Sequence, residues 1–300
     1  MTTPESKEQK LREAKRYFDA PELLLAPPIM RAAYSDRMAW IMASLAQLVY
    51  EKFEDGGDTY DYLVAELSGG GFELLDWFND KETDTQAFLV ANKAFAVLAF
   101  RGTEVTARQD IITDARALKI SIPIIEGKIK IHEGFNHAYS KVEAQIEQSL
   151  TEKLGDRPLY ITGHSLGAAL ATVATKNIEK KKWFRDQLAA CYTFGSPRVG
   201  NKTFGDDLKS PIYRVVNTTD VVTVVPTFGY RHVGDIRFLE RGAGKATGGI
   251  PVFERVSFFI KAILLNFLSP LVGDHAIIAY REKLEDIARE RNRLGKRMGR

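Results

Sequence analysis

The chain has 300 residues, of which 45% are hydrophobic and 27% are charged, proportions that suit a globular protein with one large α/β domain or two small ones. The net charge of +3 excludes a strong global attraction to nucleic acid. The single cysteine, Cys191, excludes an internal disulfide and is expected to be a small buried apolar side chain. No stretch reaches the ~18 uninterrupted apolar residues that span a bilayer. The charged N-terminus lacks the apolar core of a secretory signal, so we expect a protein that is cytoplasmic or released without a recognisable signal peptide.

The first third of the chain predicts an extension, a helix and three strands. Residues 1–30 are charged and then proline-rich, and they are expected to form an N-terminal extension. Ser35 and Asp36 are typical of a helix start, and apolar residues continue at helical spacing to about residue 53. Three strand-like segments follow a run of glycines, at residues 72–78, 87–91 and 95–100.

The remainder of the chain alternates helices with strands. The predicted elements are a helix at 136–154, a strand at 159–162, a helix after Ser165, a strand at 191–194, a short helix near Phe204, a strand at 213–216 and a last helix at 275–293. Such alternation indicates a mainly parallel sheet with helices on both faces. We predict a single α/β domain over residues 31–290, followed by a basic tail at 291–300.

A G-x-S-x-G pattern, residues 163–167, lies where a strand passes into a helix. The apolar segment 159–162 leads in, and a helix rich in small residues, 168–172, leads out. A sharp turn between them lifts the hydroxyl of Ser165 clear of the sheet, and glycine is favoured on both sides because a Cβ would collide with backbone. The helix N-terminus offers backbone N–H groups to a developing oxyanion. The pattern therefore predicts Ser165 as a nucleophile and the N–H of Leu166 as part of an oxyanion hole.

A serine nucleophile needs a base, and the base needs a carboxylate that orients it. In this arrangement the order along the chain is serine, acid and histidine. Asp220 lies just past an apolar strand, where a parallel sheet presents functional side chains, and His275 lies at the start of the last helix. We predict Asp220 as the acid and His275 as the base. His232 is the rival base, ranked lower because it follows Asp220 closely within a strand-like run.

Five motifs in the chain fit one known family. They are VLAFRGTE at 97–104, ITGHSLGAALA at 161–171, TFGSPRVGN at 193–201, N-x-x-D-x-V-x-x-x-P at 217–226 and D-H-x-x-x-x-Y at 274–280. Together they resemble the motifs of the class 3 lipases, the fungal-lipase-like branch of the α/β-hydrolases. The resemblance implies an α/β-hydrolase fold with a lid over the active site and a triad of Ser165, Asp220 and His275.

The resemblance also implies roles for residues outside the triad. Thr103 is expected in the oxyanion hole together with Leu166. Tyr50 resembles a tyrosine that closes over the oxyanion site, with a core aromatic as the alternative interpretation. The segment 104–115 resembles the lid, although Ile111 stands where family members often have tryptophan.

The apolar segment 256–272 comes just before His275 and is expected to flank the mouth of the active site. Phe258, Phe259 and Leu268 in this segment are expected to contact an acyl chain or a lipid surface, or else to pack in a buried cap helix. Because the lid segment is rather polar, we expect modest interfacial activation, with lipid contact chiefly through the apolar segment.

The expected reaction is that of a triacylglycerol lipase or other carboxylic ester hydrolase acting through an acyl-enzyme. The alternatives are a phospholipase, a short-chain or aromatic-ester esterase, an acyltransferase and, from another class, a non-catalytic binding module. His132 and His137 are interpreted as structural, and neither a metal site nor a cofactor is expected. The expected partner is a lipid or ester substrate at a lipid–water interface, with peripheral membrane contact of the basic tail as one option and a solvated tail as the other. The sequence leaves the oligomeric state open.

Overall fold

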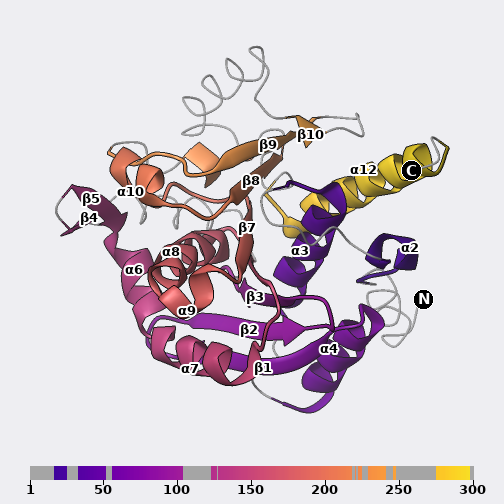
Figure 1. Ribbon diagram of the computed structural model, residues 1–300, viewed down its shortest axis with the longest axis horizontal. Helices are drawn as coiled ribbons and strands as arrows, with labels where there is room; N and C mark the ends of the chain where they lie inside the picture. The colour runs from indigo at the N-terminus through magenta and orange to yellow at the C-terminus, as the bar shows by residue number, and fades with distance from the viewer. Residues whose placement is uncertain are drawn as a thin grey trace, which may run out of the picture.

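A sheet of eight strands forms the centre of the molecule (Figure 1). The structure is a computed structural model that describes residues 17–25, 33–51, 56–103, 123–126, 128–217, 220, 222–224, 229–240, 246–247 and 275–297. The strands of the sheet lie in the order β1 (Glu73–Asp80), β2 (Thr85–Ala91), β3 (Ala96–Phe100), β6 (Leu159–His164), β7 (Leu188–Phe194), β8 (Ile212–Asn217), β9 (Asp235–Leu239) and β10 (Ala246–Thr247). Strands β3, β6, β7, β8 and β9 are mutually parallel. The pairs β1–β2, β2–β3 and β9–β10 are antiparallel. A separate antiparallel pair consists of β4 (Pro123–Glu126) and β5 (Ile129–His132).

Helices cover both faces of this sheet (Figure 1). One hydrophobic cluster contains α2 (Pro21–Leu24), α3 (Asp36–Leu48), α4 (Gly57–Gly69) and α12 (Ile277–Arg297). The other contains α6 (Glu133–Ser140), α7 (Glu143–Lys153), α8 (Leu166–Lys180), α9 (Lys182–Arg185) and α10 (Lys202–Asp207). Side chains of β3 alternate between them: Val97 and Ala99 belong to the first cluster, Leu98 and Phe100 to the second. Both faces of the central strands are covered, and β3, β6, β7 and β8 are accordingly buried along their whole length and mainly apolar.

The predicted fold class, a mainly parallel sheet with helices on both faces, is confirmed. The helix expected from Asp36 is present, with the hydroxyl of Ser35 accepting the N–H of Met38, but it ends at Leu48. The lid segment 104–115 lies outside the described residues.

Three other predictions of elements were incomplete or wrong. The single helix predicted at 136–154 is two helices, α6 and α7, because the chain turns at Val142, whose buried side chain packs in the core. Helix α4 and strand β9 were not predicted. Helix α12 continues to Arg297, so most of the expected basic tail is helical.

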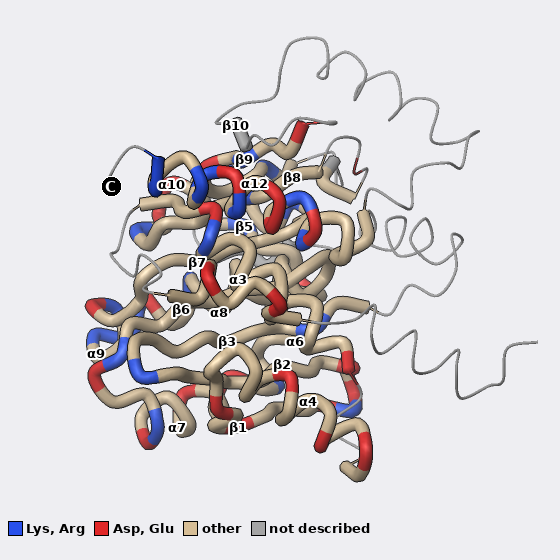
Figure 2. Tube along the Cα trace, turned by 90° about the vertical axis from the view of Figure 1, so that its right-hand side faces the viewer, with Lys and Arg blue, Asp and Glu red and all other residues tan. Residues whose placement is uncertain are grey.

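Charged residues lie mostly toward the periphery of the chain trace, with both signs interspersed (Figure 2). Within the described residues, no helix is both long enough and apolar enough to cross a membrane. Cys191 is fully buried, as predicted, and burial raises the pKa of its thiol to about 12.

A buried carboxylate fixes α8 against the segment that enters β8. Glu179 accepts the backbone N–H groups of Lys209 and Ser210, each at 3.0 Å, and the ammonium of Lys176 at 3.3 Å. Both side chains of the Lys176–Glu179 pair are at least 95% buried, and Lys176 also forms an ion pair with Asp207. The loss of Glu179 therefore leaves Lys176 with one carboxylate partner but removes the acceptor of two backbone N–H groups.

We predict that Glu179→Ala lowers the free energy of unfolding by about 2–4 kcal/mol, because the N–H groups of Lys209 and Ser210 lose their acceptor and Lys176 loses one of its two carboxylate partners. Urea denaturation followed by circular dichroism measures the change. The matched control is Glu152→Ala, at an exposed position of α7, for which we expect a change within about 0.5 kcal/mol. Equal effects of the two substitutions would contradict this account of α8.

Candidate active site

Ser165 occupies the turn between β6 and α8, with φ of 56° and ψ of −124°. Such a conformation costs a non-glycine residue about 1–3 kcal/mol. The Ser165 N–H donates to the carbonyl of Phe194 at 3.0 Å, which holds the turn against β7. A Cβ at Gly163 would overlap the backbone of Gly167, and a Cβ at Gly167 would overlap the carbonyl of Phe100. The two glycines of the G-x-S-x-G pattern are therefore required by close backbone packing, as the sequence indicated.

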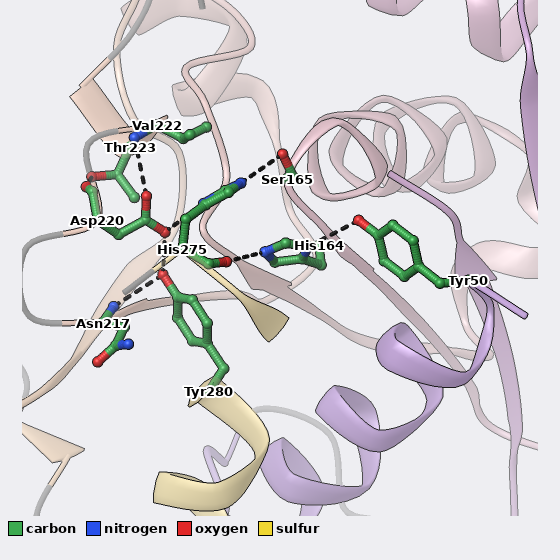
Figure 3. Close-up of polar contacts among 9 residues, drawn as sticks. All are labelled: Tyr50, His164, Ser165, Asn217, Asp220, Val222, Thr223, His275 and Tyr280. Carbon is green, nitrogen blue, oxygen red and sulfur yellow. Dashed lines mark hydrogen bonds and ion pairs between the residues drawn. The ribbon is translucent and has the colours of Figure 1, made fainter. Parts of the chain in front are cut away.

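The side chains of Ser165, His275 and Asp220 form a hydrogen-bonded series (Figure 3). The Ser165 Oγ lies 2.8 Å from Nε2 of His275, and Nδ1 of the same ring lies 2.9 Å from Oδ2 of Asp220. Only 9% of Ser165 is exposed, and His275 and Asp220 are almost fully buried. The series comes from three separate parts of the chain, at the ends of β6 and β8 and just before α12. This geometry lets the imidazole take a proton from the serine while the carboxylate orients the ring.

Asp220 is held in place by donors besides the histidine (Figure 3). The Tyr280 hydroxyl donates to its Oδ2 at 2.5 Å, and the backbone N–H of Val222 donates to its Oδ1 at 3.0 Å. The same hydroxyl accepts the N–H of Asn217 at 3.0 Å, which ties α12 to the end of β8. Both carboxylate oxygens therefore have partners, so the orientation of the carboxylate is fixed before a substrate arrives.

Comparisons with known proteins agree with this geometry. The family model for lipase (class 3) matches residues 97–230. A lipase of Rhizopus niveus is 28% identical over 211 residues, which cover 67% of this chain and 53% of that protein. Secreted mono- and diacylglycerol lipase 1 of Fusarium solani is 37% identical over 120 residues, which cover 37% of this chain and 35% of that protein. Over residues 97–230 the chain is thus similar to the class 3 lipases.

The fold is likewise that of α/β-hydrolases. The crystal structure of a lipase from Rhizopus microsporus var. chinensis superposes with a TM-score of 0.63 at 24% identity, covering 84% of this chain and 91% of that one. The chain spans about half the length of the curated Rhizopus lipase that it matches. The resemblance drawn from the five sequence motifs is thus confirmed at the level of family and fold.

A second histidine, His164, lies beside the base, with the centroids of the two rings 4.6 Å apart (Figure 3). Its Nε2 lies 2.6 Å from the backbone carbonyl of His275, and its Nδ1 lies 2.9 Å from the Tyr50 hydroxyl. Burial, with a smaller contribution from the charge of His275, lowers the pKa of His164 to about 3. The ring is therefore neutral at ordinary pH, and the carbonyl acceptor places its single proton on Nε2, so that the Tyr50 hydroxyl donates to Nδ1. His164 holds the main chain of His275 without competing for the serine proton.

The segment that ends in Thr103 packs against the elbow. A Cβ at Gly102 would overlap both the Tyr50 hydroxyl and the carbonyl of His164, so this loop passes within contact distance of the residue before Ser165. Thr103 follows Gly102 directly and is partly exposed, and Leu166 begins α8. Tyr50 is thus partly buried beside this loop and bonded to His164.

The rival base, His232, lies in a different environment. Burial lowers its pKa well below the usual range, and the charges of Arg214 and Arg198 lower it further. Its ring forms a hydrogen bond with the backbone of Thr223, and within the described residues no contact with Ser165 is found. A ring that faces two guanidinium groups would hold an abstracted proton poorly.

Sequence reasoning placed the triad residues in one series but missed His164. Its only signal was its position inside the G-x-S-x-G pattern, where the variable residue carries no expectation of its own. Phe258, Phe259 and Leu268 lie outside the described residues. Among the residues that the structure does describe, no group of three or more His, Cys, Asp or Glu side chains is arranged to hold a metal ion.

The buried neutral state of His164 predicts an acid dependence of stability. The pKa of a histidine is about 6.5 in an unfolded chain and falls to about 3 for His164 in the folded protein. Between these values the unfolded state binds more protons, so the stabilisation is complete above pH 6.5 and is lost as the pH falls toward 3, by at most about 1.4 kcal/mol per pH unit.

Urea unfolding between pH 4.5 and 7.5 measures this slope. His164→Asn keeps one donor and one acceptor but has no titrating group, so it should flatten the slope. His137→Asn, at an exposed position of α6, is the control and should leave the slope unchanged. An unaltered slope in His164→Asn would show that this ring is not the group that titrates.

Proposed function

We propose that this chain is a serine hydrolase that cleaves carboxylic esters of acylglycerols. The observation that carries the proposal is the series from Ser165 through His275 to Asp220, built on a strained strand-to-helix turn. A serine hydroxyl is a weak nucleophile at neutral pH and becomes reactive when an oriented imidazole accepts its proton. The distances of 2.8 and 2.9 Å along the series allow that transfer without rearrangement.

The first step of the proposed reaction forms an acyl-enzyme. The Ser165 Oγ attacks the ester carbonyl carbon, and its proton passes to Nε2 of His275. Asp220 stabilises the imidazolium, since its Oδ2 accepts a hydrogen bond from the N–H at Nδ1 and remains ionised. The imidazolium then gives its proton to the alcohol oxygen, which leaves as the tetrahedral intermediate collapses. In the second step water attacks the acyl-enzyme, with His275 as base again, and releases the carboxylic acid.

Backbone N–H groups stabilise the oxyanion in this scheme. The N–H of Leu166 lies in the first turn of α8, where N–H groups have no intrahelical acceptor. The packing of Gly102 against His164 supports Thr103 as the second donor, through its backbone N–H. Each such donor contributes roughly 3 kcal/mol of transition-state stabilisation.

Lipid esters are the substrate class that the relatives favour. The similar proteins of Rhizopus niveus and Fusarium solani are named as a lipase and as a mono- and diacylglycerol lipase. We propose that this chain acts on the same class at a lipid–water interface. Hydrolysis of emulsified triolein, emulsified diolein, phosphatidylcholine and soluble p-nitrophenyl butyrate separates the possibilities, and activity confined to the soluble ester would contradict a lipid substrate.

We predict that Ser165→Ala abolishes covalent labelling by a fluorophosphonate probe and lowers ester turnover by several orders of magnitude. Gel fluorescence and titration of released acid measure the two effects. Ser68→Ala, at an exposed serine of α4, is the control and should be labelled like the unaltered chain. Retention of labelling in Ser165→Ala would rule out this nucleophile, and absence of labelling in the unaltered chain would favour a non-catalytic binding module.

The two histidines that follow Ser165 in the chain give a second prediction. His275→Ala should approach the loss seen with Ser165→Ala, whereas His232→Ala should retain most of kcat because its ring faces arginines. Asp220→Asn should be severe but less complete, since the losses of residues that act as a unit are not additive. Steady-state kinetics on one soluble ester compares all three, and an inactive His232→Ala with an active His275→Ala would reverse the assignment.

A further inference from the structure

The structure has a concave site that none of the triad residues lines. It has a volume of about 810 Å³, and we call it the basic groove. The described residues that line it are Lys130, Arg198, Asn201, Lys202, Gly229, Tyr230, Arg231 and His232. Four of these eight are lysine or arginine and none is acidic, and no triad residue is among them.

The walls of the basic groove are fixed by main-chain hydrogen bonds among three segments of the chain. Isolated β-bridges join Gly200 to Ile131 on one side and to Arg231 on the other. The N–H of Asn201 donates to the carbonyl of Lys130 at 3.0 Å, and the N–H of Arg231 donates to the carbonyl of Gly200 at 2.7 Å. Figure 1 shows the elements on two of these segments, β5 and α10, side by side at one edge of the molecule. The side chains of the groove therefore project from a rigid frame.

A further arginine, Arg214, lies close to the arginines that line the groove. Arg198 is partly buried, and burial together with the charge of Arg231 lowers its pKa. Behind them Arg214 is 92% buried, and burial, with a contribution from Arg198, lowers its pKa to about 10. Like charges held close together in a partly desolvated place repel one another, and an anion bound between them relieves that repulsion.

Polar atoms without partners lie in the same place. Within the part of the chain that the structure describes, the Tyr230 hydroxyl, Nδ1 of His232 and Nε of Arg214 are buried and make no hydrogen bond. A buried donor without an acceptor costs roughly 1–3 kcal/mol. Two described acids act on residues of the groove: Asp206 pairs with Lys202, both exposed, and Glu133 adds to the effect of burial in raising the pKa of Tyr230. Lys130 and Arg231 lie at exposed positions on the rim of the groove.

We propose that the basic groove binds a phosphate-type oxyanion carried on a larger molecule. A phosphate presents several strong acceptor oxygens, which suit guanidinium, ammonium and phenol donors that converge from three segments. The volume exceeds what one phosphate group fills, so the rest of the ligand also has room. The source of the phosphate is either a lipid headgroup or a soluble phosphorylated compound, and the chemistry of recognition is the same for both.

The test uses Ser165→Ala protein throughout, so that no ester is hydrolysed. Inorganic phosphate and glycerol 3-phosphate are titrated at constant ionic strength set with chloride, and two-dimensional NMR follows the amides of Gly200 and Arg231 and the ring of His232. We expect saturable shifts confined to the groove. Arg231→Gln and Lys130→Gln should each weaken binding at least about tenfold, since each removes a charged hydrogen-bond donor.

The matched control is Lys182→Gln, which removes the same charge at an exposed position of α9 and should leave the affinity unchanged. Absence of saturable shifts, or an equal loss in Lys182→Gln and Arg231→Gln, would overturn the proposal, because binding would then follow net charge alone. Sedimentation with phosphatidylcholine vesicles that contain or lack phosphatidic acid distinguishes the sources. Vesicle binding that needs both phosphatidic acid and Arg231 assigns the groove to a lipid headgroup, and phosphate binding without it assigns the groove to a soluble ligand.

Discussion

The backbone conformation of Ser165 is the constraint on which the site depends. A φ of 56° is unfavourable for a residue with a side chain, so the surrounding structure must hold it. The hydrogen bond to Phe194 does so from one side, and the contacts of Gly163 and Gly167 leave no room for another path of the chain. Since β6 is fully buried and α8 is buried from Gly167 to Lys176, packing that stabilises the whole domain also offsets the local strain. The serine side chain consequently points where the histidine can reach it, without relying on a flexible loop.

A carboxylate and two imidazoles lie inside this otherwise apolar region, and their arrangement follows from the cost of burying polar groups. Asp220 has no exposed surface, and it is stabilised because His275, Tyr280 and a backbone N–H all donate to it. His164 avoids the cost of a buried charge because it remains neutral, and both of its ring nitrogens form hydrogen bonds. Because His164 binds the main chain of His275, the elbow fixes the position of the base as well as that of the nucleophile.

The sequence predicted those features that depend on local chemistry. The elbow needs glycine on both sides of Ser165, and the order of serine, acid and histidine follows from the topology, so both could be read from the residues. The break between α6 and α7 could not, because the turn at Val142 is set by packing, and its own residues favour a continuous helix. His164 was missed for a similar reason, since its role depends on His275, which is distant in sequence and adjacent only in the fold. The contacts expected of Phe258 remain a prediction, as that residue lies outside the described part of the chain.

The contrast between His275 and His232 shows how the fold assigns different chemistry to the same side chain. His275 is buried and His232 is partly buried, and different charged groups face the two rings. His275 faces a carboxylate that favours a transient imidazolium, whereas His232 faces Arg198 and Arg214. The two environments are close together, because Thr223 donates its hydroxyl proton to the carbonyl of Asp220 and its backbone bonds to His232. A short turn thus separates the carboxylate that orients His275 from the two guanidinium groups that face His232.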